Sequence, residues 1–220
     1  MLCFLYTDDC PIDGGNVWEM LNMADTYGIP LLVEKCMKYI CETVNKCNVL
    51  EYSQRSLIYD KNSMMMKKCW EIINNSYDYV ITTEAFLKIS PELLAEIAQH
   101  CIRDNENLFF DQVIAWSRKE CERRGVNATV ANIQRLLSNI KPKLHFEQMD
   151  VYNLVTKVRN SGLLSSKELL DAIAAVATEQ RSRKLQKQQS EIDTLNHQLS
   201  LDMDFLERWQ VTPNPAFKYP

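Results

Sequence analysis

The stretch that decides the fold lies in the middle of the chain, where residues 105–121 read NENLFFDQVIAWSRKEC. Phe109, Val113 and Trp116 recur at the spacing of one face of an α-helix. A second apolar row lies beside them and consists of Phe110, Ile114 and Cys121. Two adjacent rows predict a core helix about 28 Å long with an apolar face wide enough for two neighbours. Trp116 could instead line a ligand pocket, but its helical spacing favours the core.

Both ends of this helix carry start and stop signals. Asn105 is expected to cap the N-terminus, and the carboxylate of Glu106 suits the positive end of the helix dipole. Basic residues occupy the last turn, and Gly125 can adopt the left-handed conformation that closes a helix.

The composition is that of a globular protein of one or two domains. The 220 residues are 46% hydrophobic and 25% charged, and the five glycines and seven prolines favour helices over a turn-rich β fold. The net charge of −4 predicts no general attraction to nucleic acid or to an anionic membrane. Neither a secretion signal nor an apolar run of ~18 residues, the length of a membrane span, is found in the sequence.

The eight cysteines are expected to be reduced thiols inside the cell. Most occupy apolar helix faces, where cysteine acts as a small hydrophobe, and none forms a C-x-x-C pair. A zinc site at Cys36, Cys41 and Cys47 is the alternative. However, the spacing of Cys36 and Cys41 places them on different faces of a helix, and no paired histidine follows. The sequence therefore predicts no metal site.

Start and stop signals divide most of the chain into helical hairpins. A first helix begins after Asn16 and ends at Gly28, and Pro30 opens a second that runs to about residue 44. Further helices are expected from 48 to 58, from about 63 to 75, after Ser90-Pro91-Glu92, and near 130–137 and 146–154. The apolar faces of these helices are expected to include Ile58 and Tyr152. The predicted fold class is all-α.

The C-terminal part of the hairpin region ends in one more turn and helix. The turn at residues 161–165 is expected to bury Leu163 and Leu164, and Ser165 or Ser166 is expected to cap a final helix. The predicted apolar face of that helix consists of Leu169, Leu170, Ile173 and Ala177.

The composition changes after Glu179. Apolar residues then recur every seven positions, at Leu185, Ile192, Leu199 and Leu206. Leu195 occupies a d-type position of this repeat, whereas Gln188 and Asp202 occupy the neighbouring ones. We interpret residues 179–206 as an extended helix or weak coiled coil and residues 207–220 as a disordered tail. The basic residues at 181–187 could form a nuclear signal, but a solvated helix face is the favoured interpretation.

No pattern of catalytic residues emerges. The sequence has no Gly-rich phosphate loop, no nucleophile elbow and no His-x-x-x-His pair. His100, His145 and His197 are scattered, and no cysteine or carboxylate is spaced to complete a triad with them. We therefore predict a protein that is not an enzyme, with no catalytic residues and no cofactor.

Two parts of the sequence resemble known domains. The element Leu5-Tyr6-Thr7-Asp8 and the hairpin that contains ADTYGIPLL at residues 24–32 resemble the C-terminal half of a BTB/POZ domain. The helix around Trp116 and the turn Ser161-Gly162-Leu163-Leu164 resemble a BACK domain. The resemblance is to BTB-BACK proteins that are not of the kelch type. It places the BTB part at residues 1–45 and the BACK domain at residues 46–178.

The sequence departs from this family in two places. The N-terminal half of the BTB domain, which in the family holds the dimer interface and a cullin-contact motif, is missing, so we expect a truncated or fragmentary chain. Near residue 141 the family usually reads R-[FY]-P-L, whereas this chain reads Lys141-Pro142-Lys143-Leu144.

The resemblance implies a protein-interaction adaptor that recruits substrates to a cullin-RING ubiquitin ligase in the cytoplasm or the nucleus. The implied partners are a cullin scaffold, an unknown protein substrate and, in the intact protein, a second copy. Tyr6 is the one cullin contact that the resemblance carries over, with a solvated rim tyrosine as the alternative. The helix pair at 48–75 would form the floor of the cullin groove. The alternative function is a helical scaffold that self-associates through residues 185–206 and binds no cullin.

Overall fold

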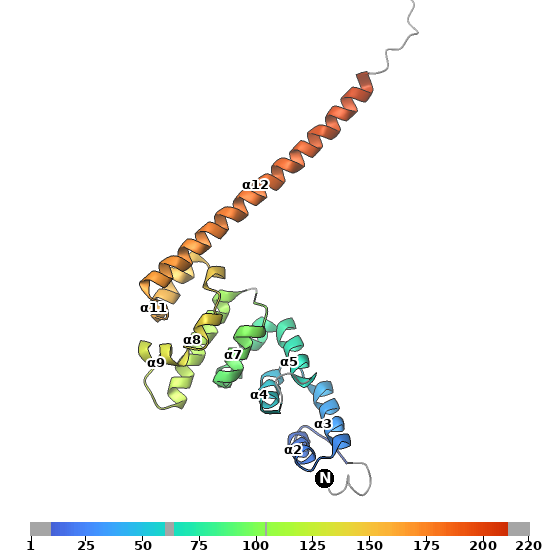
Figure 1. Ribbon diagram of the computed structural model, residues 1–220, viewed down its shortest axis with the longest axis vertical. Coiled ribbons are helices and arrows are strands. Elements are labelled where there is room, and N and C mark those ends of the chain that lie inside the picture. Colours follow the sequence, from blue (N-terminus) through green and yellow to red (C-terminus); the bar gives the residue numbers. More distant parts are fainter. Residues whose placement is uncertain (1–9, 60–63, 104, 211–220) are drawn as a thin grey trace, which may run out of the picture.

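The structure is a computed structural model that describes residues 10–59, 64–103 and 105–210. Every regular element in these ranges is a helix, which confirms the predicted all-α class. Figure 1 shows an array of short helices from which one long helix, α12, runs away. None of the described helices is long and apolar enough to cross a membrane.

The array consists mainly of short helices that follow one another in hairpins. In chain order the elements are α2 (Val17–Thr26), α3 (Pro30–Thr43), α4 (Val49–Tyr59), α5 (Met64–Asn75), α6 (Tyr77–Ile81), η1 (Phe86–Lys88), α7 (Pro91–His100), α8 (Glu106–Arg123), α9 (Val130–Leu136), η2 (Lys141–Lys143), η3 (Phe146–Gln148), α10 (Val151–Asn153), η4 (Leu154–Val158), α11 (Arg159–Ser161) and α12 (Ser166–Gln210). The hairpin α2–α3 and the pair α4–α5 lie at one end of the array, and α8 and α9 lie toward the other (Figure 1).

The local signals in the sequence begin and end these helices as predicted. The Oγ of Ser90 accepts a hydrogen bond from the backbone N–H of Leu93 at 3.3 Å, and the Oδ1 of Asn105 accepts one from Leu108 at 3.0 Å. Gly125 closes α8 with a φ of 67°, a left-handed conformation in which a side chain would be strained.

Helix α8 is the centre of the core. Phe109, Val113, Trp116 and Cys121 are fully buried, and Phe110 is nearly so. The helix contacts α6, η1 and α9, so its wide apolar face is covered by several elements. Leu163, in the turn before α12, is also buried, whereas Leu164, expected to be buried with it, is only partly so.

The segment at 146–158 is not the single short helix that the sequence predicts. It consists of the 3-10 turn η3, one α-helical turn in α10 and the π-helical segment η4. Because these segments differ in residues per turn, one helical period cannot describe which side chains face inward. Tyr152 was expected to be buried but is 75% exposed, whereas Leu154 and Val158 are buried.

Three other residues predicted to face the core lie on the surface. Ile58, in the last turn of α4, is 80% exposed because the neighbouring Leu57 takes the packed position one helical step away. Leu170 is 66% exposed and Ala177 is exposed, whereas Val176 is buried. The prediction failed here because α12 is supported along one narrow edge, at Leu169, Ile173 and Val176.

Helix α12 continues without a break through the position where the sequence suggested a boundary. Its 45 residues run from Ser166 to Gln210, so the final hairpin helix and the extended helix are one element. Residues 207–210, expected in a disordered tail, belong to this helix, and residues 211–220 lie outside the described ranges.

Candidate functional site

The hairpin α2–α3 and the pair α4–α5 pack as one unit. The ring of Trp18 on α2 meets the ring of Tyr52 on α4 edge-on, with centroids 5.3 Å apart. The guanidinium of Arg55 on α4 lies 5.1 Å from the centroid of the same indole, and α3 contacts α5. A partner could therefore touch both helix pairs on one continuous surface.

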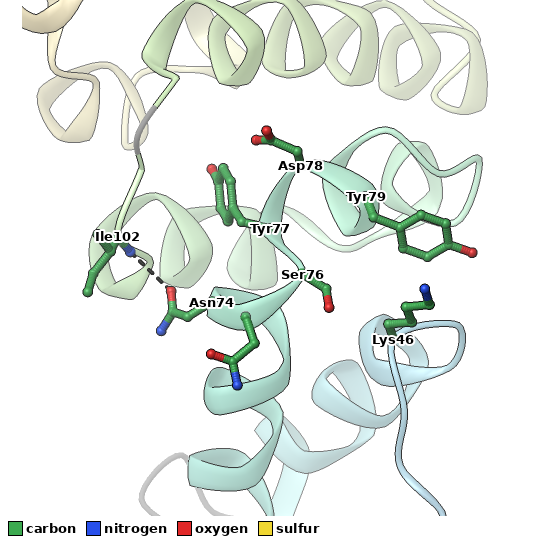
Figure 2. A pocket seen from close by; sticks show the side chains of 8 residues that line it. Lys46, Asn74, Ser76, Tyr77, Asp78, Tyr79 and Ile102 are labelled. Carbon is green, nitrogen blue, oxygen red and sulfur yellow. Dashed lines mark hydrogen bonds between the residues drawn. The ribbon is translucent and has the colours of Figure 1, made fainter.

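An open groove of about 520 Å³ lies where three connections of the array meet (Figure 2). Lys46 comes from the link between α3 and α4, Ile102 from the link between α7 and α8, and the rest from the end of α5 and the start of α6. The complete lining is Lys46, Asn74, Asn75, Ser76, Tyr77, Asp78, Tyr79 and Ile102. The exposed side chain of Ile102 adds an apolar edge to a mostly polar groove.

The exposed side of the groove is organised around Tyr79. The ammonium of Lys46 lies 4.8 Å from the centroid of the Tyr79 ring, a cation–π contact. The Tyr79 hydroxyl lies 3.7 Å from the thiol sulfur of Cys47, and this hydrogen bond raises the pKa of Tyr79. With Asp78 nearby, the groove offers both charges, an aromatic face and several amide groups, a mixture suited to binding polypeptide.

A buried ion pair lies near Tyr77, behind the residues that line the groove. Arg103 and Glu106 are almost fully buried, with their Nε and Oε2 atoms 2.7 Å apart. Arg103 also donates to the backbone oxygens of Ala98 and Lys143, and Glu106 accepts from the backbone N–H of His145. The pair therefore ties α7, α8 and the η2–η3 link together. The sequence had assigned Glu106 a role toward the helix dipole only.

Tyr77 lines the groove and lies close to this ion pair. Its ring lies 6.2 Å from that of Phe109 on α8, and burial raises the pKa of its hydroxyl. Asn74 fastens the link after α7, because its Oδ1 accepts a hydrogen bond from the backbone N–H of Ile102 at 3.1 Å (Figure 2). The groove thus lies on a rigid base.

The residues singled out from the sequence lie elsewhere. Phe109, Val113, Trp116 and Leu163 are core residues, and Tyr6 lies outside the described residues. Sequence reasoning missed Lys46, Tyr79 and Ile102. Their only signal was a tyrosine on the polar side of a short helix, which by itself does not distinguish a site from ordinary surface.

The histidines do not approach the groove. His100 pairs with Glu96 on α7, His145 pairs with Glu147, and His197 is exposed on α12. Cys36, Cys41, Cys47, Cys69, Cys101 and Cys121 carry free thiols, and no group of three potential metal ligands occurs in the described ranges. Burial raises the pKa of Cys36 to about 11 and that of Cys101 to about 12, so these thiols behave as hydrophobes.

Comparison with known families assigns both parts of the chain. Residues 1–44 match the BTB/POZ domain, and residues 49–149 match the BACK domain, described as BTB And C-terminal Kelch. The chain therefore belongs to the BTB-BACK proteins, as the sequence resemblance suggested. BTB and BACK domains are protein-interaction domains, and Lys46 lies between the two matched regions.

Individual relatives belong to the same class. BTB/POZ domain-containing protein 6 of Xenopus laevis is 22% identical over 169 residues, which are 76% of this chain and 32% of the relative. Its namesake in Homo sapiens is 21% identical over the same length, with 31% of the relative covered. BTB/POZ domain-containing protein 3 of Homo sapiens is 21% identical over 172 residues, which are 78% of this chain and 33% of the relative. The chain thus spans about a third of the length of these relatives.

Proposed function

We propose that this chain is part of a protein-interaction adaptor that recruits substrates to a cullin-RING ubiquitin ligase. In this proposal residues 1–75, extended by the adjoining side chains at 76–79 and 102, bind the N-terminal region of a cullin. The rest of the region at 100–206 binds the protein substrate. The adaptor would act in the cytoplasm or the nucleus. The observation that carries the proposal is the packing of the BTB hairpin against the first BACK helix pair, through Trp18, Tyr52 and Arg55.

The groove in Figure 2 is the proposed binding site for a segment of the cullin. It begins at Lys46, between the two matched domains, and the end of α5 contributes Asn74 and Asn75 to it. A polypeptide in the groove could stack on Tyr79 and hydrogen-bond to the asparagine amides. Lys46 and Asp78 would favour a segment that carries charges of both signs.

A second proposed contact is the tip of the pair α4–α5. Ile58 is 80% exposed on α4, and Met64, the first residue of α5, is 73% exposed. Exposed apolar side chains of this size are frequent anchors of protein interfaces. Tyr6 stays a proposed cullin contact on the strength of the family resemblance alone.

Binding of the full chain to a purified cullin N-terminal region, measured by calorimetry, tests the proposal. The double variant Lys46→Glu/Tyr79→Ala is expected to weaken binding about tenfold or more, because each change removes a groove contact. Ile58→Asp/Met64→Asp tests the tip separately, and Tyr6→Ala tests the contact carried over from the family.

The control is Tyr152→Ala, which alters an aromatic side chain on α10 that is even more exposed than Tyr79. Its affinity is expected to equal that of the unchanged chain. Absence of cullin binding by a folded chain would contradict the cullin part of the proposal. Equal losses in the control and groove variants would contradict the assignment of the groove.

A further inference from the structure

The outer part of α12 leaves the array without any neighbour to support it. Val176 is its last buried residue, and every described side chain after it is exposed. The helix nevertheless continues to Gln210, about 50 Å further at 1.5 Å per residue. Most helices in proteins are stabilised by packing of an apolar face, and isolated helices in water are marginal. A long unsupported helix therefore calls for a partner.

The exposed part carries its own apolar seam. Leu185, Ile192 and Leu199 lie seven residues apart, Leu195 lies between the last two, and each of these side chains is about half or more exposed. Leu206 continues the repeat in the sequence, although its side chain lies outside the description. A spacing of 3.5 residues is the pattern by which one α-helix packs against another in a coiled coil.

We infer that residues 185–206 of α12 form a parallel two-stranded coiled coil with the same helix of a second copy of this chain. This inference does not depend on cullin binding, because α12 shares no residue with the groove or with residues 1–75. The second copy supplies a helix with the same repeat in the same phase, so each apolar residue meets its own counterpart.

The apolar layers select the parallel orientation. In a parallel pair Leu185, Ile192, Leu195 and Leu199 each face the same residue of the partner, and Gln188 and Asp202 are the two polar layers. In an antiparallel pair an a-type residue faces a d-type residue. If Ile192 then faces Leu195, Leu199 faces Gln188 and Leu185 faces Asp202. In the antiparallel pair, two apolar residues of each helix therefore face polar residues of the other.

The charges of the helix favour the antiparallel orientation, but their effect is weaker than that of the apolar layers. Residues 181–187 are basic and residues 191–207 are mainly acidic, so an antiparallel pair would bring opposite charges together. Most of these charges lie at outer positions of the repeat. At those positions the charges of the two helices are far apart, and salt screens the interaction between them. At the flanking positions of a parallel pair, Lys184 faces Gln189 and Glu191 faces Asn196, so no like charges meet there. The one like-charged layer of the parallel pair is Asp202, which faces its own counterpart between Leu199 and Leu206.

Sedimentation equilibrium of the full chain tests the association. The unchanged chain is expected to dimerise with increasing concentration, and Ile192→Asp is expected to raise the dissociation constant about tenfold or more. Leu201→Asp is the matched control, because Leu201 is equally exposed but lies off the seam. It is expected to leave the dimer unchanged. A chain that is monomeric throughout, or variants with equal effects, would overturn the inference.

Disulfide formation tests the orientation. Gln188→Cys places a thiol in a layer that faces its own copy only in the parallel pair, whereas Ser190→Cys places one on the outer side. Oxidation is expected to give a covalent dimer of the Gln188→Cys chain above the background of the unchanged chain, and none of the Ser190→Cys chain. No covalent dimer above that background at position 188 would overturn the parallel arrangement.

Discussion

The indole of Trp116 shows how much a single side chain contributes to this fold. Its ring is fully buried, and its Nε1 donates a hydrogen bond of 3.0 Å to the backbone oxygen of Ile89. This bond joins the centre of α8 to the turn before α7. The indole therefore both fills space in the core and donates a buried hydrogen bond. Two substitutions can separate these contributions.

We predict that Trp116→Phe lowers the free energy of unfolding by about 1–3 kcal/mol, because the carbonyl of Ile89 loses its donor. Trp116→Ala is predicted to cost about 3–5 kcal/mol, since it also opens a cavity. Urea unfolding followed by circular dichroism measures both. Identical losses in the two variants would contradict the separate role of the hydrogen bond.

The Arg103–Glu106 pair gives a second prediction at this scale. Arg103→Met alone is expected to lower the free energy of unfolding by about 3–5 kcal/mol, because Glu106 keeps a buried charge without its partner. The double variant Arg103→Met/Glu106→Leu is expected to recover most of that loss. A double-mutant cycle in urea measures the coupling. Additive losses would show that the two side chains act independently.

Single turns between helices decide how the elements meet. Gly28 and Gly162 both have left-handed backbone conformations, with φ of 63° and 65°. A Cβ at Gly28 would have no neighbour within 4 Å, whereas one at Gly162 would lie 2.7 Å from the Cγ1 of Val130. The two glycines therefore share backbone strain and differ in packing.

We expect Gly28→Ala to lower stability by about 1–2 kcal/mol, because a residue with a Cβ is strained in the left-handed conformation. Gly162→Ala is expected to cost more, because α9 must also shift away from the new methyl group. Thermal unfolding of both variants measures the difference, and Val130→Ala should rescue part of the Gly162→Ala loss. Equal costs without rescue would contradict the packing argument.

The base of α12 provides a pH-dependent element. Lys141 donates to the Oε1 of Glu168 at 2.8 Å, and Ser165 donates its backbone N–H to Oε2. These bonds lower the pKa of Glu168 from its ordinary value of 4.5 to about 2, and the bond from Lys141 has the larger effect. A lowered pKa in the folded state stabilises the fold above the unfolded value, and this contribution is lost as pH falls from 4.5 toward 2.

Glu168→Gln is therefore predicted to make stability less dependent on pH below about 4.5, with Glu191→Gln on the exposed part of α12 as control. Thermal unfolding across that pH range gives the comparison. The two variants should differ in stability above about pH 4.5 and converge as the pH falls toward 2. Parallel pH profiles for the unchanged chain and Glu168→Gln would contradict the assignment.

At the scale of the whole molecule, the array and the outer half of α12 are independent in packing. The described side chains after Val176 are exposed, whereas the core runs continuously from Val17 to Val176. A chain that ends at residue 180 is therefore expected to unfold at a transition temperature close to that of the full chain. Both chains are measured in dilute solution, where each is a monomer. A large drop would show that α12 supports the array beyond its base.

The same scale shows which features could be predicted from the sequence. The caps at Ser90 and Asn105 and the buried row Phe109, Val113 and Trp116 depend on residues a few positions apart, so the sequence predicts them directly. The segment at 146–158 was predicted wrongly, because η3, α10 and η4 do not share one helical period. The exposure of Ile58 depends on which neighbours cover α4, which local spacing does not specify.

By itself, the sequence determined the all-α class, most of the helix boundaries and the BTB-BACK family, because these follow from periodicity, caps and motif residues within single segments. Only the tertiary structure decided the groove around Tyr79, the bond from Trp116 to Ile89 and the pairs that Arg103 makes with Ala98, Lys143 and Glu106. The physical reason is that most of these contacts join segments separated by tens of residues. Their geometry depends on how helices pack and not on which helices form.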